Sequence, residues 1–298
     1  MSQAAVPLAA ARGAWDVLRD YLSLLKLRIV VLLVGTAVGP MVPAARGVPR
    51  ASALIAVVLG GTLAAGGAHA INCWFDRDID AAMTRTSRRP LPAGRIPPWH
   101  ALVIGVVLNV IAFAVLLAGA NLLAAGLALA GTLIYVFVYT IWLKRHTPQN
   151  IVIGGAAGAV PPLVGWAAAT GHLDVTALAL FGVIFFWTPP HFWALAQMIK
   201  SDYARAHIPM LPVVGGDRSA KRQSIVYAAL AVAASVVPFF TGSAGAIYLA
   251  GAAVLGIGLL GITVLDLKGR RWTRRVFTYS ITYMALLFTL FAVSPFLP

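Results

Sequence analysis

Long apolar runs alternate with short polar stretches along the whole chain. Nine of these runs approach the roughly 20 residues that a helix needs to cross a bilayer. They lie at about 24–44, 51–72, 100–119, 121–143, 151–169, 175–198, 224–242, 246–265 and 276–296. The pattern predicts an all-α polytopic membrane protein: an N-terminal segment, 1–23, followed by one transmembrane domain, 24–298, that forms a bundle of nine transmembrane helices.

Composition agrees with this prediction. Hydrophobic residues make up 60% of the chain and charged residues 11%, with a mean hydropathy of +0.86, which is outside the range of soluble domains. The first 20 residues mix charges with alanines and show no short apolar core of a cleavable signal, so we expect this segment to stay on the membrane surface. A single cysteine, Cys73, excludes an intrachain disulfide framework.

Positive charge is distributed unevenly between the two sides of the predicted bundle. All lysines and arginines except Arg46 and Arg50 precede the first span or lie at its start, or follow an even-numbered span. The positive-inside rule therefore places the N-terminus and these loops in the cytoplasm, for a multi-pass protein of the cell (inner) membrane. Because this bias explains the pI of about 10.8, we expect no nucleic-acid partner. The long cytoplasmic loops, at about 73–99 and 199–223, are where we expect the function.

The first long loop begins with a cluster of aspartates in "NCWFDRDID". The chain has nine acidic residues and no glutamate. At helical spacing Asn72, Asp76 and Asp80 share one face, His69 lies beneath Asp76 as a candidate orienting group, and Asp78 points away. A row of oxygen ligands at a membrane boundary suits Mg²⁺, which combines a few carboxylates with water and substrate phosphates.

A structural explanation of the same cluster remains open from spacing alone. The aspartates could instead cap a helix end and pair with neighbouring cations, because ion-pair networks of this kind are common. The candidate partners are Arg77, Arg85, Arg88 and Arg89. Guanidinium groups bind phosphate as readily as carboxylate, so these arginines fit both interpretations.

The stretch "NCWFDRDIDAAMTRTSRRPLPAG" resembles the signature of the UbiA-type intramembrane prenyltransferases. The matching positions are Asn72, Asp76, Asp80, Met83, Arg85, Thr86, Arg89 and Gly94. Within that superfamily, "YTIWLKRHTPQNIVIGGAAGAVPPLVGW", "WTPPHFWALA" and "DYARAHIPMLPVV" are similar to the protoheme IX farnesyltransferases, also called heme O synthases. The resemblance covers about 20–296.

This resemblance implies a fold, a reaction and partners. The expected reaction joins the farnesyl group of farnesyl diphosphate to a vinyl group of heme B, with water addition, and yields heme O and diphosphate for terminal oxidases, whose assembly proteins are candidate partners. Asn72, Asp76 and Asp80 are then expected to hold Mg²⁺ and diphosphate, and Arg85 and Arg89 to contact phosphate oxygens. Cationic groups and the metal would stabilise the departing anion.

The second long loop is expected to complete the site through Asp202, as a further catalytic and metal-binding carboxylate. The superfamily commonly has a second aspartate pair here, but this chain offers one acid. Lys200, Tyr203 and Arg205 are its expected partners toward phosphate or a heme propionate. The alternative is a plain loop ion pair between Asp202 and Arg205.

Four cations near span ends are further candidates for substrate binding. Lys26 and Arg28 flank Leu27, where the family commonly has proline, and are candidate diphosphate contacts. Lys144 and Arg145 could bind phosphate or a heme propionate, or could act only as topology determinants.

His191 lies within the sixth predicted span, directly after Pro189 and Pro190. An intramembrane histidine is a functional candidate, and helical spacing puts it on the face of Asp202 three turns later. Contact with the porphyrin or its iron is one interpretation. The other is a hydrogen bond to a carbonyl that the prolines leave free.

Two other classes of protein share some of these features. A transporter or channel would hold its ionisable groups near the midplane of broken helices, whereas these aspartates lie at span ends. A prenyltransferase with a phenolic or quinone acceptor shares the aspartate motif, and only the "PPHFWALA" and "IPMLPVV" segments favour heme.

Overall fold

The computed structural model describes residues 13–297, and within that range its regular structure is entirely helical. Nine helices are long and apolar enough to cross a membrane, which confirms the prediction. They are α2 (Leu27–Ala44), α3 (Ala51–Phe75), α5 (Pro98–Gly119), the composite span Leu122–His146, α8 (Asn150–Thr170), α9 (Val175–Met198), α12 (Gly216–Phe240), α13 (Ala246–Leu265) with η2 (Asp266–Lys268), and α14 (Arg270–Val293) with η3 (Ser294–Phe296). The N-terminal positions 1–12 of the predicted segment 1–23, Arg12 included, lie outside the described residues.

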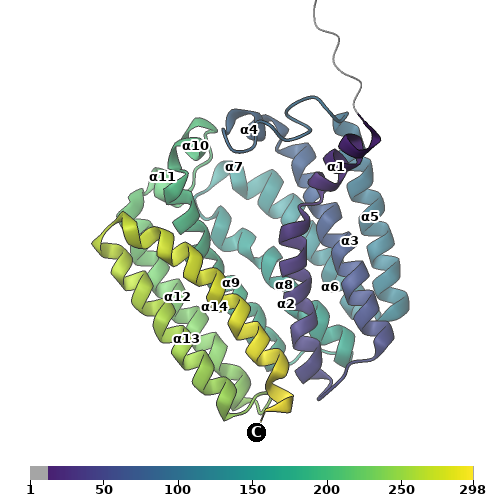
Figure 1. Cartoon of the computed structure of the whole chain (residues 1–298), viewed down its shortest axis with the longest axis vertical. Coiled ribbons are helices and arrows are strands. Elements are labelled where there is room, and N and C mark those ends of the chain that lie inside the picture. The colour runs from purple at the N-terminus through teal and green to yellow at the C-terminus, as the bar shows by residue number, and fades with distance from the viewer. Residues whose placement is uncertain (1–12, 298) are drawn as a thin grey trace, which may run out of the picture.

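Four of the short helices lie at one end of the bundle, which we call the loop end (Figure 1). They are α1 (Ala14–Leu24), α4 (Arg77–Ala82), α10 (Lys200–Arg205) and α11 (Leu211–Val214). The C-terminus lies at the opposite end. Both long polar loops therefore meet on one face.

Three predicted span boundaries were wrong at the loop end. The first span begins at Leu27 rather than 24, because Lys26 adopts a left-handed conformation, φ 51°, that separates α1 from α2. The seventh and ninth spans, α12 and α14, begin at Gly216 and Arg270, before the predicted 224 and 276. Hydropathy detects only the apolar part of a helix, whereas these two continue past it as polar turns.

Close helix packing rests on small residues. A Cβ on Gly165 of α8 would lie 1.7 Å from the carbonyl oxygen of Ala37 on α2, and one on Gly105 of α5 would lie 2.7 Å from that of Gly67 on α3. Helices in lipid gain little from apolar burial against one another, so this close backbone approach carries much of the packing. Among the nine spans α8 is the most buried, and it occupies the interior of the bundle.

The fourth span contains a stretch of wide turns. It begins as α6 (Leu122–Leu133), widens into the π-helix η1 (Ile134–Leu143) and ends as α7 (Lys144–His146). Runs of π-helix are rare and frequently accompany functional sites. Here the wide turns lead directly into Lys144.

Candidate active site

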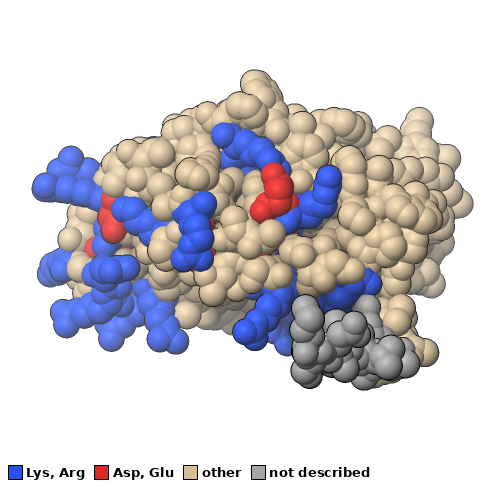
Figure 2. Space-filling model, turned by 90° about the horizontal axis from the view of Figure 1, so that it is seen from above, with Lys and Arg blue, Asp and Glu red and all other residues tan. Residues whose placement is uncertain are grey.

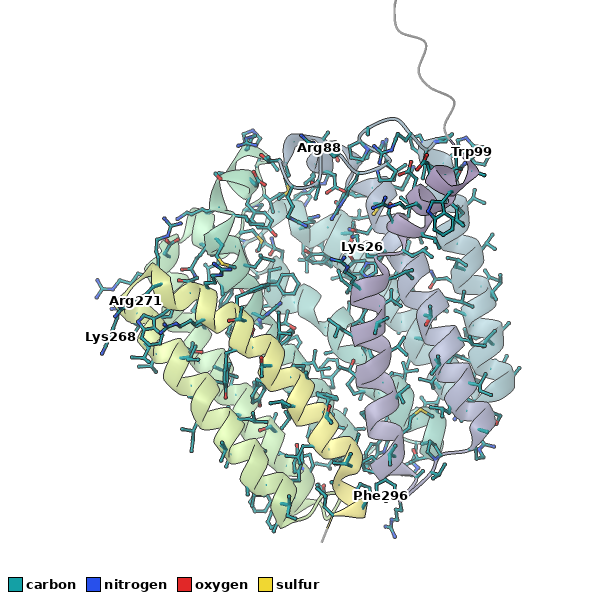
Figure 3. The ribbon with its side chains drawn as sticks, viewed as in Figure 1. Lys26, Arg88, Trp99, Lys268, Arg271 and Phe296 are labelled. Atoms are coloured by element: carbon teal, nitrogen blue, oxygen red, sulfur yellow. The ribbon has the colours of Figure 1, made fainter. Side chains whose placement is uncertain are left out.

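The first aspartate of the cluster lies in a buried hydrogen-bond network where α3 ends. Asp76 is 2% exposed, and its Oδ2 accepts hydrogen bonds from Asn72 Nδ2, at 2.7 Å, and from Lys144 Nζ. Asn72 Oδ1 in turn accepts from Lys26 Nζ at 2.9 Å. Burial lowers the pKa of the Lys26 ammonium, since desolvation disfavours the charged form. Figure 3 shows Lys26 at the loop end of α2.

One oxygen of Asp76 is left unsatisfied. Its Oδ1 is buried and has no hydrogen-bond partner among the described residues. A buried carboxylate oxygen without a partner costs free energy, so such atoms in native proteins call for a ligand, an ion or a functional role. This oxygen fits a hard divalent cation.

Asp80 lies one helical turn further and forms a separate ion pair. Its Oδ2 accepts from Arg89 Nη1 at 2.8 Å, and its backbone carbonyl accepts from the Thr86 hydroxyl at 2.9 Å. Asp80 and Arg89 line a cavity of about 170 Å³ together with Lys26 and Cys73. The cavity and the adjoining network together contain two carboxylates, those of Asp76 and Asp80. They also contain three cationic side chains, those of Lys26, Arg89 and Lys144, and this excess of positive charge suits an anionic substrate.

Thr140 belongs to the network and was missed in the sequence. Its hydroxyl is fully buried within η1, accepts from Asn72 Nδ2 at 3.1 Å and donates to the carbonyl of Tyr135 at 2.8 Å. The available signal was a polar pair four residues apart, Thr140 and Lys144, at the end of an otherwise apolar span. Only the fold brings that pair to Asn72 and Asp76.

His69 does not orient Asp76, contrary to the expectation from spacing. Its Nδ1 lies 3.3 Å from the Tyr135 hydroxyl, its Nε2 is buried without a partner, and no hydrogen bond joins it to the carboxylate within 13–297. The rings of His69 and Tyr135 meet edge to face. The hydrogen bonds that orient the Asp76 carboxylate come instead from Asn72 and Lys144.

Asp78 points away from the buried row, as predicted. Its side chain is 61% exposed and forms a two-pronged pair with Arg145, with both N–O distances 2.8 Å. Hydrogen bonds from Arg145 hold the pKa of the Asp78 carboxyl below its usual value. Arg145 is thereby committed to this surface pair, whereas its neighbour Lys144 turns inward.

The second loop packs onto the first. Arg205 Nη1 donates to the Thr84 hydroxyl at 2.7 Å and lies 3.4 Å from Asp202 Oδ1. Burial on its own raises the pKa of Asp202, but hydrogen bonds from the Thr84 side chain and the Thr84 and Arg85 backbone outweigh it and leave the pKa below its usual value. Asp202 is thus held as a carboxylate against the loop that carries the arginines.

Other expected partners of Asp202 lie elsewhere. Lys200 pairs with Asp217 at 2.9 Å, and its expected role beside Asp202 toward phosphate or a heme propionate stays a prediction. Tyr203 packs among Ile79, Met83 and Tyr139, and burial raises its pKa to about 12. Those rings and aliphatic groups form an apolar wall beside the polar network.

Two candidate cations are exposed. Neither Arg28 nor Arg85 has a hydrogen-bonded or ion-paired side chain among the described residues. Arg85 belongs to the loop that Asp202 contacts, whereas Arg28 lies on the outside of α2. The structure brings neither into the buried network.

His191 lies between two parallel aromatic rings. Its ring stacks on Trp187, with centroids 4.3 Å apart, and on Phe277, at 4.7 Å. Nδ1 lies 2.8 Å from the Ser280 hydroxyl rather than near a carbonyl that the prolines free. The expected common helical face with Asp202 was also wrong, because α9 ends at Met198 and α10 starts afresh at Lys200.

The Ser280 contact indicates which tautomer His191 adopts. The Ser280 hydroxyl donates its one proton to the carbonyl of Phe277 at 2.7 Å, so it accepts from His191 Nδ1–H. The neutral ring then carries a lone pair on Nε2, which has no hydrogen-bond partner among the described residues. This is the tautomer that ligates metals through Nε2.

No group of three or more histidine, cysteine or acidic side chains within the described range could hold a metal by itself. Mg²⁺ does not require one, since it is commonly bound by one or two carboxylates together with substrate phosphates. The buried carboxylate, amide and lysine network thus gives the loop end of the bundle a site whose excess of positive charge suits an anion.

The chain belongs to the UbiA prenyltransferase family, whose profile matches residues 32–281, and it is a prenyltransferase. It is 53% identical over 274 residues to a protoheme IX farnesyltransferase of Gloeobacter violaceus, covering 91% of this chain and 90% of that protein. It is 51% identical over 284 residues to one of Roseiflexus sp., covering 94% of this chain and 53% of the relative. The chain thus spans about half the length of the Roseiflexus protein.

Solved structures share the fold at lower sequence identity. A digeranylgeranylglyceryl phosphate synthase matches with a TM-score of 0.78 and 20% identity, over 94% of this chain and 99% of that one. A UbiA homolog from Archaeoglobus fulgidus, bound to DMAPP and Mg²⁺, matches with a TM-score of 0.63 and 18% identity, over 92% and 99%. The nine-helix UbiA fold is therefore confirmed.

Proposed function

We propose that the chain transfers the farnesyl group of farnesyl diphosphate to a vinyl group of protoheme IX, heme B, and so forms heme O and diphosphate. The observation that carries this proposal is the buried Asp76, which keeps one oxygen free beside Lys144 and the Asn72–Lys26 pair. The names of the relatives, at about half identity, support heme as the acceptor.

The reaction breaks the bond between the first farnesyl carbon and the diphosphate oxygen, and the bonding electrons leave with the diphosphate. The vinyl π electrons then form the new carbon–carbon bond. Water adds to the cation that remains beside the porphyrin and loses a proton to solvent. Lys26, Lys144 and Arg89 lie where they can stabilise the leaving anion, and the apolar wall around Tyr203 keeps water from the allylic cation.

Mg²⁺ is the proposed cofactor, with Asp76 and Asp80 as its principal ligands. When bound, it would neutralise charge on the diphosphate oxygens. The amide oxygen of Asn72 accepts a hydrogen bond from Lys26, and its amide nitrogen donates one to Asp76. The proposed role of Asn72 is therefore to hold the Asp76 carboxylate in place. Asp202, held ionised beside Thr84, completes the negative charge from the second loop. Arg85 and Arg205 are proposed to reach phosphate or heme propionate oxygens from the loops.

His191 is proposed to contact the heme. Its aromatic stack with Trp187 and Phe277 is flat and apolar, and its Nε2 lone pair is free, so it can approach the porphyrin or its iron. The site draws on the N-cap of α2 and on residues of α3, α4, η1, α7 and α10, so we treat 24–298 as one catalytic domain.

We further propose that the loop end faces the cytoplasm and that the chain resides in the cell membrane. The lysines and arginines concentrate at that end, whereas Arg46 and Arg50 lie beyond the other end of α2. Terminal oxidases are the proposed destination of the product, with their assembly proteins as partners.

The test uses purified full-length protein in proteoliposomes, with farnesyl diphosphate and heme B, and detects heme O by chromatography and mass spectrometry. We expect heme O to form, to stop with EDTA and to resume with Mg²⁺. A matched reaction replaces heme by 4-hydroxybenzoate. Prenylation of the phenol with no heme product would overturn the acceptor assignment, and full turnover in chelator would remove the metal.

A second measurement tests His191 alone. His191→Ala is expected to weaken heme binding and change the heme absorption spectrum, while farnesyl diphosphate binding stays near the wild-type value. Ser280→Ala is the matched variant, because it removes only the hydroxyl that fixes the tautomer. Equal weakening of both substrates with a lower melting temperature would assign His191 a packing role instead.

A further inference from the structure

Seven exposed cations gather at the loop end of the last three spans. We call them the three-helix patch: Arg218, Arg222, Lys268, Arg270, Arg271, Arg274 and Arg275. Figure 2 shows basic side chains gathered along the left edge of the loop end, over α12, α13 and α14. Figure 3 labels Lys268 and Arg271 there, across the bundle from Lys26. The patch is therefore separate from the active site.

A buried contact holds the three helix ends together beneath the patch. Lys221 of α12 donates to the backbone carbonyl of Asp266 at 2.7 Å and pairs with its Oδ1 at 3.0 Å. The Thr273 hydroxyl of α14 donates to the same Oδ1 at 2.6 Å. Since Lys221, Asp266 and Thr273 are all buried, the exposed arginines around them project from a fixed base.

In the part of the chain that the structure describes, the patch has no acidic partner of its own. Within residues 13–297 none of its seven cations forms an ion pair. The two nearby acids are already engaged, Asp217 with Lys200 and Asp266 with Lys221. By contrast, Arg89 and Arg95 in the first loop and Arg145 of α7 each pair with an aspartate. Repulsion among the seven charges is thus left for an external anion to offset.

The level of the patch indicates which anion. Lys268 is the last residue of one span and Arg270 the first of the next, so the cations lie where the bilayer's apolar layer meets its headgroups. Trp272 lies in the same layer, with the guanidinium of Arg275 4.5 Å and that of Arg271 5.7 Å from its ring. Tryptophan beside basic residues is typical of a membrane interface.

We propose that the three-helix patch binds the phosphate groups of anionic phospholipids in the leaflet at the loop end. Juxtamembrane clusters of four to eight lysines and arginines bind such lipids, because each cation near the surface is attracted to the anionic headgroups. Arginine suits phosphate because its planar fork donates two parallel hydrogen bonds. The patch presents six arginines to one lysine.

The test measures lipid enrichment at Trp272. Full-length protein is placed in phosphatidylcholine nanodiscs that contain a minor share of either phosphatidylglycerol or more phosphatidylcholine, with bromine on the acyl chains of that share. Quenching of Trp272 is taken as the difference between wild type and Trp272→Phe. The patch variant is Arg270→Gln with Arg274→Gln. The matched control is Arg46→Gln with Arg50→Gln, which also removes two exposed arginines.

Wild type is expected to prefer phosphatidylglycerol at Trp272, and the patch variant to lose about tenfold or more of that preference, since two cations are removed. The control is expected to keep it, and added salt to weaken it in wild type. Equal quenching by the two lipids in wild type would overturn the proposal, as would an equal loss in the control. Stronger binding of soluble polyglutamate than of phosphatidylglycerol would overturn it in favour of an acidic protein.

Discussion

Two buried lysine–aspartate pairs lie near the loop end, and they are built differently. In the pair Lys221–Asp266, the lysine also binds a backbone carbonyl, Thr273 also binds the carboxylate, and no side-chain atom of the pair is left buried without a partner among the described residues. In the pair Lys144–Asp76, one carboxylate oxygen accepts both available donors and the other has none.

This difference separates a structural pair from a binding site. A buried ion pair is tolerated when further hydrogen bonds satisfy its remaining atoms. A pair that leaves an oxygen bare keeps a free energy cost in the folded protein, which a ligand can recover on binding. Burial and charge are similar at both aspartates, so neither property alone identifies the active site.

The largest expected effect tests the structural pair. Asp266→Ala leaves Lys221 buried without its counter-ion and is expected to cost about 3–5 kcal/mol of stability, measured by unfolding in detergent. Lys221→Met with Asp266→Leu is the matched double variant and should recover most of the loss. Prenyl transfer per folded molecule should stay unchanged. Lost activity in a stable variant would remove the distinction between the two pairs.

Asp76→Ala is expected to lower activity strongly and stability only modestly, the reverse of the order expected for Asp266→Ala. Prenyl transfer should fall by about 10²-fold or more, because the site loses a charge aimed at the reacting groups. Stability should fall less than in Asp266→Ala, since the substitution also removes a buried oxygen that had no partner. Asp80→Ala should behave like Asp76→Ala, whereas exposed Asp78→Ala should be much milder. Equal losses of activity at all three positions would contradict the inward orientation of the row.

A smaller loss of activity is expected at Thr140, where the substitution removes a single hydroxyl from the network around Asp76. Thr140→Val removes the acceptor that fixes Asn72 and should lower transfer about tenfold, the effect of one buried hydrogen bond. Thr140→Ser should restore activity. Thr132→Val is the control, because Thr132 donates to Asn109 at 2.8 Å in the same span but away from the site. An equal loss in the control would indicate general loosening of the span.

The smallest effect concerns the exposed pair of Asp78 and Arg145. The folded-state pKa of Asp78 is depressed below its usual 3.8, so the pair's stabilisation is present above that value and is lost as pH falls through the folded pKa. The free energies of unfolding of wild type and Asp78→Asn should differ by about 1 kcal/mol at most at neutral pH and converge in acid, which melting temperatures measured across that pH range would follow. A constant difference down to low pH would contradict this assignment.

The sequence predicted those parts of the molecule that depend on local pattern. Apolar runs predicted nine spans, and helical spacing predicted that Asn72 and Asp76 meet while Asp78 points outward. The spans follow from continuous apolar runs and the aspartate orientations from neighbours within about one helical turn, so both depend on residues that are close in sequence. The kink at Lys26 was missed because its left-handed backbone leaves no mark in hydropathy.

The contacts that distinguish the two pairs could not be predicted in this way. Lys144 and Asp76 are 68 positions apart, and Lys221 and Asp266 are 45 apart. Such pairs form only when distant helices pack side by side, and that packing cannot be read from local sequence patterns. The same limit explains why His69 was expected to orient Asp76, since the two residues are close in sequence and at helical spacing.

The number of residues in the wide turns of η1 determines which way the side chains after it point. If one residue were deleted within η1 and the remaining turns stayed wide, every side chain beyond the deletion would rotate by close to one residue's angular step, about 100° in an α-helix. Lys144 would then leave Asp76, and Arg145 would leave Asp78. A one-residue deletion in a surface loop is usually absorbed locally, but here it would redirect both lysine and arginine at once. Alignments of relatives should therefore treat a gap within 134–143 as a change of chemistry rather than of length.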